Sequence, residues 1–106
     1  MIKLESSFIG TGEVKGFNFN LLKKNEYAFI YEVKSSSSNK WYEVFERRIS
    51  KESDSVIGGV PIHFEEHEIY PKSASFGVWA WCIKNKKDAV NKFLEISEKK
   101  ERNIKT

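Results

Sequence analysis

The segment SFGVWAWCIKNKKDAV, residues 75–90, joins a strand-like pattern to a helix-like one. Aromatic and other apolar residues fill its first half, which is typical of a strand. In the second half and beyond it, Ala89, Val90, Phe93, Leu94 and Ile96 recur at helical spacing. This spacing predicts an amphipathic helix over 86–99. Asn85 suits the N-cap position, because its side-chain oxygen can accept a backbone N–H of the first turn.

Two tryptophans stand two positions apart in the predicted strand 76–83. Since successive side chains of a strand point to opposite faces, we expect Trp79 and Trp81 on one face and Ala80 and Cys82 on the other. Both sides of this strand are apolar, so both faces of its sheet require cover, and one helix covers only one of them. We expect at least one of the two tryptophans to lie in the core.

The rest of the chain contains further strand-like runs separated by polar breaks. The runs lie at 13–21, 26–33, 40–49 and 61–70. The breaks are SSSS at 35–38, SKESDSVIGG at 50–59 and YPKSAS at 70–75. Short connections between consecutive strands favour an antiparallel meander. The predicted fold is therefore α+β, with a four- to five-stranded antiparallel meander sheet and one C-terminal amphipathic helix packed on one face.

The length of 106 residues predicts a single domain. Within it we expect an N-terminal segment at 1–22, the meander at 26–83, the helix at 86–99 and a frayed tail at 100–106. The formal net charge is only +3, which does not demand a nucleic-acid partner. Cys82 is the only cysteine, so no intramolecular disulfide can form. The start of the chain lacks a secretory pattern and no window approaches about 18 apolar residues, which predicts a soluble cytoplasmic protein with no membrane partner.

The sequence offers few candidates for chemistry. In HFEEH, residues 63–67, we expect His63, Glu65 and His67 on one strand face, with the imidazoles about 13 Å apart. That separation is too long for one mononuclear metal ion unless the strand bends, so the two histidines are weak metal candidates and a charged strand face is the favoured interpretation. GTGEVKG at 10–16 matches no phosphate-binding loop and predicts a turn. Cys82 as a nucleophile would need a nearby imidazole. We expect no cofactor and no catalytic residue.

Basic and aromatic residues interleave in and near the strand at 40–49. Arg47 and Arg48 follow Trp41 and Tyr42 in the chain, and lysines cluster nearby, at Lys23, Lys24, Lys34 and Lys40. Single-stranded nucleic acid is bound by such combinations through stacking and phosphate contacts. Several glutamates dilute the basic character, however, which favours a solvated charged surface.

Two segments, WYEVFERR at 41–48 and EIYPKSASFGVWAW at 68–81, precede the predicted helix. In this pattern the chain resembles small phage- and prophage-encoded proteins of unknown function over residues 40–96. The resemblance implies no active site. It implies a context, since such genes often encode compact proteins that bind and block host machinery, anti-CRISPR proteins among them.

These observations favour a non-enzymatic phage-type binding protein of the host cytoplasm that inhibits or redirects a host defence complex. The expected partner is a host protein or ribonucleoprotein, with a Cas effector or its guide RNA complex as one candidate and RNA as a further contact. The candidate contact residues are those that the helix is expected to leave uncovered: Trp41, Tyr42, Arg47, Arg48, Trp79 and Trp81. Two alternatives stay open, a small single-stranded nucleic-acid-binding protein and a metal- or thiol-dependent enzyme using His63, His67 or Cys82. A homodimer that buries the second sheet face is compatible with all three.

Overall fold

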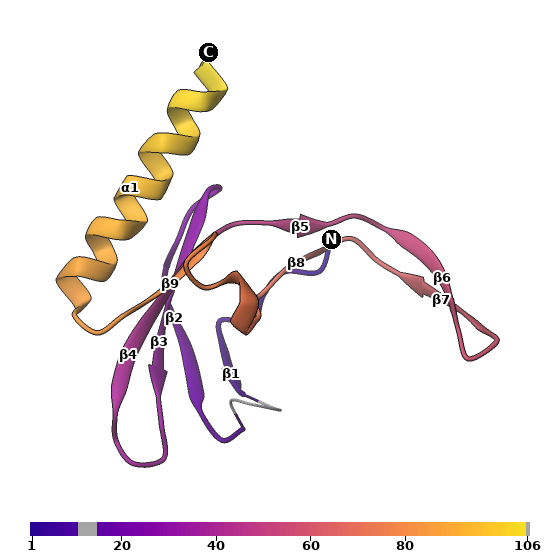
Figure 1. Cartoon of the computed structure of the whole chain (residues 1–106), viewed down its shortest axis with the longest axis horizontal. Helices are drawn as coiled ribbons and strands as arrows, with labels where there is room; N and C mark the ends of the chain where they lie inside the picture. The colour runs from indigo at the N-terminus through magenta and orange to yellow at the C-terminus, as the bar shows by residue number, and fades with distance from the viewer. Residues whose placement is uncertain (11–14, 106) are drawn as a thin grey trace.

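The computed structural model describes residues 1–10 and 15–105, and side chains as far as residue 102. Val14 and most of the glycine-containing segment 10–16 lie outside the described residues. The main sheet is antiparallel, with the strand order β1-β2-β3-β4-β9, and α1 packs against it (Figure 1). Its strands are β1 (Ser7–Ile9), β2 (Asn18–Lys24), β3 (Ala28–Lys34), β4 (Lys40–Glu46) and β9 (Ala80–Ile83), and the helix is α1 (Lys86–Lys105). The predicted α+β fold with a five-stranded sheet is confirmed.

The helix-covered face of the sheet forms the first of two cores. The apolar stripe of α1 buries Ala89, Phe93 and Ile96 against β3 and β4. Every second residue of the facing strands packs against this stripe: Ala28 and Ile30 from β3, and Tyr42 and Val44 from β4. Among the residues of α1 whose side chains are described, Ile96 is the last buried apolar one, yet the helix continues to Lys105. The predicted helix, which ended at residue 99 and was followed by a frayed tail, was therefore shorter than the helix in the structure.

The opposite face of the sheet is covered by the chain itself. Tyr70 lies at the centre of this second core, with its ring centre 5.0 Å from that of Phe45 and 5.4 Å from that of Tyr31. The N-terminal segment also packs here, because the Tyr31 hydroxyl donates a hydrogen bond to the carbonyl oxygen of Glu5 at 2.7 Å. Phe8 stacks on Phe19 with ring centres 4.7 Å apart. Both faces of the central strands are therefore buried.

Trp79 and Trp81 lie on opposite faces of the sheet, and the prediction of a shared face was wrong. Trp79 belongs to the second core, whereas Trp81 packs at the edge of the helix-covered core. The reason is a turn just before the strand. Gly77 has a positive φ of 89°, and its N–H donates to the carbonyl oxygen of Ala80 at 2.7 Å. Strand alternation therefore begins only at Ala80, after the first tryptophan.

Between β4 and β9 the chain leaves the main sheet. This excursion holds β5 (Ile49–Ser50), β6 (Ser53–Ile57), β7 (Val60–Phe64), β8 (His67–Glu68) and a short 3-10 helix, η2 (Ser73–Ser75). The strands pair as β5 with β8 and β6 with β7. The predicted strand at 61–70 is thus broken in two and stays outside the main sheet, and the predicted loop at 50–59 contains a strand.

The β6–β7 hairpin forms because its two-residue turn carries two glycines. Gly58 and Gly59 have positive φ values of 58° and 79°, which the central residues of a type I′ hairpin turn require. Ile57 pairs directly with Val60 across the turn. Isolated two-stranded hairpins are marginally stable in water, so the two-glycine turn is important for the stability of this hairpin.

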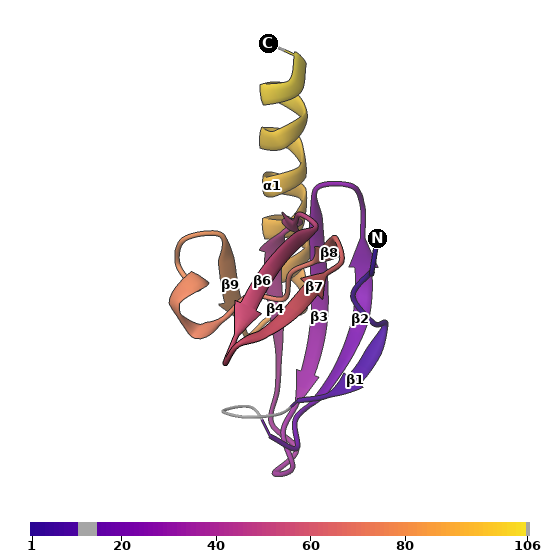
Figure 2. The ribbon, with the colours of Figure 1, turned by 90° about the vertical axis from the view of Figure 1, so that its right-hand side faces the viewer.

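The hairpin and the end of α1 both project from the body of the molecule (Figures 1 and 2). The radius of gyration is 15.4 Å. A compact domain of about this length has a radius of gyration of about 13 Å, so the projecting segments make this chain more extended than a compact domain.

No helix in the described part of the chain is long and apolar enough to cross a membrane.

The start of α1 gives a first prediction. The Asn85 side-chain oxygen accepts the backbone N–H of Lys87 at 2.8 Å and that of Asp88 at 3.4 Å, which confirms the predicted N-cap. Replacing Asn85 with alanine is expected to lower the free energy of unfolding by about 1 kcal/mol. Urea denaturation followed by circular dichroism measures this loss. Asn91→Ala in the exposed middle of α1 is the control and should be neutral or stabilising, because alanine has the higher helix propensity. Equal stability of Asn85→Ala and the wild type would contradict the capping role.

Candidate interaction surface

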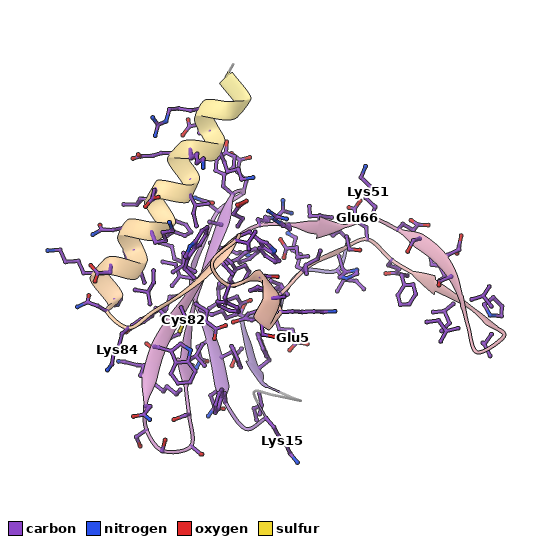
Figure 3. The ribbon with its side chains drawn as sticks, in the orientation of Figure 1. Glu5, Lys15, Lys51, Glu66, Cys82 and Lys84 are labelled. Carbon is purple, nitrogen blue, oxygen red and sulfur yellow. The ribbon has the colours of Figure 1, made fainter. Side chains whose placement is uncertain are left out.

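The β6–β7 hairpin, residues 53–64, extends away from the main sheet and is called the arm (Figure 1). Among the described strands, its two strands pair only with each other. Every residue from 51 to 61 is exposed. Lys51 and Glu66 lie where the two chain segments enter and leave the arm (Figure 3). The arm is therefore the most solvent-accessible element of the described structure.

One face of the arm is apolar. The register pairs Ile57 with Val60, Ser55 with Ile62 and Ser53 with Phe64, and paired residues share a face. Ile57 and Val60 are 55% and 58% exposed, and Phe64 is 40% exposed. Together with the half-buried Ile62, these side chains line one side of the hairpin, and the described residues leave Ile57 and Val60 largely exposed on it. A continuous exposed apolar surface of this kind marks an interaction site more often than single scattered residues do.

The other face of the arm is apolar near the turn, at Val56 and Pro61, and carries charge nearer the root. The His63 imidazole lies between two carboxylates, with Nδ1 2.7 Å from Asp54 Oδ1 and Nε2 3.3 Å from Glu52 Oε1. His67 lies in β8, after the break in the predicted strand, and its Nδ1 is 2.9 Å from the carbonyl oxygen of Glu65. The expectation that both histidines share one strand face was wrong. Among the described residues, no three histidine, cysteine or acidic side chains gather in a group that could hold a metal ion.

A groove of about 910 Å³ lies beside the root of the arm. One wall comes from the N-terminal segment, residues 2–9, and the other includes Phe64 and His67. Tyr70 also lines the groove, so its lining continues from the second core of the sheet. Phe64 belongs to both the groove and the apolar face of the arm, and His63 from the other face lines the groove as well, so the groove adjoins the root of the arm.

A buried ion pair holds the wall of the groove in place. Arg47 Nε donates to Glu68 Oε2 at 2.6 Å, and Glu68 Oε1 accepts the backbone N–H of Leu4 at 2.9 Å. Backbone hydrogen bonds of Ile2 to Glu66 and Glu68 add a short parallel bridge. Burial alone would raise the pKa of Glu68, but the hydrogen bonds from Arg47 and Leu4 and the charge of Arg47 outweigh it and lower this pKa. The N-terminal segment is therefore fixed to the excursion.

The aromatic residues predicted to contact a partner lie in several environments. Tyr42 is buried beneath α1, and Trp81 lies on the same covered face with the Lys92 ammonium 4.1 Å from its ring centre. The expectation that the helix leaves these two uncovered was wrong. Trp79 is buried in the second core. Trp41 is half-buried, and its indole Nε1 donates to a Glu43 carboxylate oxygen at 3.2 Å.

The two arginines predicted to contact a partner are neighbours with different roles. Arg47 makes the buried ion pair with Glu68. Arg48 is exposed, with its guanidinium 4.8 Å from the ring centre of Trp79 and 3.6 Å from a Glu46 carboxylate oxygen. The six predicted contact residues are divided between the two sides of the sheet, so they do not form one surface. Whether Arg48 or Trp41 contacts a partner stays a prediction.

The apolar face of the arm was missed by the selection of aromatic and basic residues. The signal was present in VIGGVPI at 56–62, where apolar residues flank a glycine pair between polar segments. An apolar–Gly–Gly–apolar pattern is typical of a tight hairpin. Sequence alone does not show that such a hairpin stays uncovered.

Comparison with known proteins adds no family to this description. No protein-family model matches the chain, and no curated protein or solved structure matches it either. The resemblance of 41–48 and 68–81 to phage-encoded proteins stays a prediction.

Proposed function

We propose that this chain is a non-enzymatic binding protein that holds a protein partner with the arm and the adjoining groove. The observation that carries the proposal is the apolar face of a projecting hairpin, on which Ile57, Val60 and Phe64 are exposed and Ile62 is half-buried. Burying such side chains at an interface is favourable, at about 25 cal/mol per Å² of apolar surface removed from water. The open edges of the two-stranded arm add backbone donors and acceptors, which a partner strand can pair with.

A protein partner fits this surface better than a nucleic acid. The other face and the root of the arm carry acidic side chains, including Glu52, Asp54 and Glu66, which repel phosphate. The aromatic side chains of the second sheet face are packed under Tyr70 and the N-terminal segment instead of forming an open stacking platform. Arg47 is held by Glu68, so its charge is already matched within the chain.

The resemblance to phage-encoded proteins supports a more specific version of the proposal. In that version the partner is a host defence complex in the host cytoplasm, such as a Cas effector, and the arm covers a functional surface of it. RNA contact enters only through a ribonucleoprotein partner. The geometry of the arm supports the binding mode, and the resemblance alone supports the identity of the partner.

The test is affinity capture from host lysate with and without nuclease, followed by titration of the purified partner. The double variant Ile57→Ser, Val60→Ser is expected to weaken binding at least about 30-fold, because central apolar anchors contribute about 2 kcal/mol or more to an interface. Thermal unfolding of this variant should match the wild type, since both side chains are exposed.

Val78→Ser is the matched control for the arm variant. Val78 is 68% exposed, as apolar as the arm residues, and lies in the turn before β9 instead of on the arm. It should leave affinity unchanged. Full affinity of the arm variant for the purified partner would contradict the proposal. A captured species that nuclease destroys and that contains no protein would favour the nucleic-acid alternative.

A further inference from the structure

A second cavity, of about 410 Å³, lies on the face of the sheet opposite α1. Its lining includes three aromatic residues, Phe19 from β2, Tyr70 and Phe76, together with Pro71 and Ser73. Glu43 of β4 and Cys82 of β9 also line it, and these two residues face each other in the strand register. Cys82 lies towards the end of β9, close to Lys84 in the view of Figure 3. The cavity is within the size range of small-ligand sites.

Glu43 is the unusual member of this cavity. It is only 8% exposed, and its two carboxylate oxygens are held in place by neutral donors. Tyr70 Oη donates to Oε1 at 3.0 Å, and Trp41 Nε1 donates to Oε2 at 3.2 Å. In the described part of the chain, no lysine, arginine or histidine nitrogen lies within ion-pair distance of Glu43. The carboxylate is therefore buried, oriented and without a counter-charge.

The surroundings of Glu43 favour a positive charge. Burial raises the pKa of Glu43, against the lowering effect of the hydrogen bonds from Trp41 and Tyr70. A cation in the cavity would balance the carboxylate, and the negative faces of aromatic rings attract cations as well. Buried charges in proteins are normally paired. Here Glu43 provides the anion, three aromatic residues line the same cavity, and none of the described side chains pairs with the carboxylate as a cation.

We propose that this cavity binds a small organic cation with a quaternary ammonium group, with Glu43 as its counter-ion. A quaternary group suits the site because it needs no hydrogen-bond acceptors. Each oxygen of Glu43 already accepts one hydrogen bond, which leaves the carboxylate about two acceptor sites, and the rest of the lining is apolar apart from Tyr70, Ser73 and Cys82. A primary ammonium group would require up to three acceptors. This inference goes beyond the proposed protein binding and does not depend on the arm.

The experiment compares choline with its neutral carbon isostere, 3,3-dimethylbutan-1-ol. Binding to the full chain is followed by the indole N–H signal of Trp41 in NMR spectra, and Trp41→Phe identifies that signal. Choline is expected to bind at least about 10-fold more tightly than the isostere, since the two differ only in charge. Equal affinities, or no shift of the Trp41 signal up to about 10 mM choline, would overturn the proposal.

Glu43→Gln is the variant that isolates the charge. Glutamine fills the same space, accepting from the Trp41 indole through its oxygen and donating to the Tyr70 hydroxyl through its nitrogen. It should remove the preference for choline over the isostere. The indole signals of Trp79 and Trp81, which lie outside the cavity lining, report whether this variant is folded. A folded Glu43→Gln protein that keeps the preference would contradict the role of Glu43.

A pH titration of the wild type tests the same charge without a mutation. The titratable groups that face Glu43 are Tyr70 and Cys82. Burial, followed by the charge of Glu43, raises the pKa of both, so both stay neutral in acid. Choline affinity should therefore fall at least about threefold between pH 7 and pH 4, where a carboxyl group with a pKa above 4.5 is mostly protonated. Constant affinity across this range in the folded protein would overturn the proposal.

Discussion

Replacing Phe45 with alanine is expected to lower the free energy of unfolding by about 3–5 kcal/mol. The Phe45 side chain is fully buried in the second core. Its ring centre lies 5.2 Å from that of Phe29, 5.0 Å from that of Tyr70 and 6.3 Å from that of Trp79. The ring therefore joins the central strands to the chain segments that cover them. Alanine would remove these contacts and leave a cavity that rigid strands on both sides cannot fill.

Urea denaturation monitored by circular dichroism measures the loss, and Phe64→Ala is the matched control. Phe64 is also a phenylalanine in a strand, but it lies on the exposed face of the arm. Its replacement should change stability by less than about 1 kcal/mol. Similar losses for the two variants would mean that the arm packs against other apolar surface, and would remove the basis for treating it as a free docking surface.

The parts of the fold that the sequence predicts are those with a regular apolar period. In β3, Phe29, Tyr31 and Val33 alternate with Ala28 and Ile30, and each set belongs to a different core. The helix is predicted for the same reason, since the buried Ala89, Phe93 and Ile96 recur at helical spacing. In these elements the residues that recur with the strand or helix period are also the buried ones, so the sequence pattern predicts the burial.

The wrong predictions concern places where a turn or a break in the backbone interrupts the alternation of side chains between the two faces of a strand. Gly77 opens a turn that places Trp79 and Trp81 on opposite faces, although they are two residues apart. In the excursion, the predicted strand at 61–70 ends at Phe64, and pairing resumes only at His67. Period alone could not reveal either break, because the residues on both sides of each break remain strand-like.

The candidate sites were harder to predict, because exposure depends on distant segments. Trp, Tyr and Arg anchor many interfaces, yet Tyr42 lies beneath a helix that starts more than forty residues later. Glu43 sits beside it in the chain but becomes a buried anion only when Tyr70 folds over the sheet. Residue type identifies groups that are able to bind a partner or a ligand, whereas their burial is decided by contacts between remote segments.

Replacing Arg47 with methionine is expected to lower the free energy of unfolding by about 3 kcal/mol at neutral pH. Removing one partner of a buried ion pair lowers the free energy of unfolding by about 3–5 kcal/mol. The lower end of this range applies here because the Arg47 side chain is partly exposed. Methionine retains the apolar stem but leaves the Glu68 carboxylate, only 8% exposed, without its cation. Arg48→Met is the control and should cost less than about 1 kcal/mol, since its ion pair with Glu46 is longer and its guanidinium is exposed.

The pH dependence of this deficit identifies its cause. In the wild type the pKa of Glu68 is lowered on folding, so the pair stabilises the fold above the unfolded-state pKa, and this contribution is lost as the pH falls through the folded-state pKa. In Arg47→Met the carboxylate keeps its burial and loses its cation, which raises its pKa. Protonation then removes an uncompensated charge, so the gap between the variant and the wild type should narrow from pH 7 to pH 4 in urea melts. A gap that stays constant over this range would show that Arg47 acts through packing of its stem, and that the groove wall does not depend on the charge of Glu68.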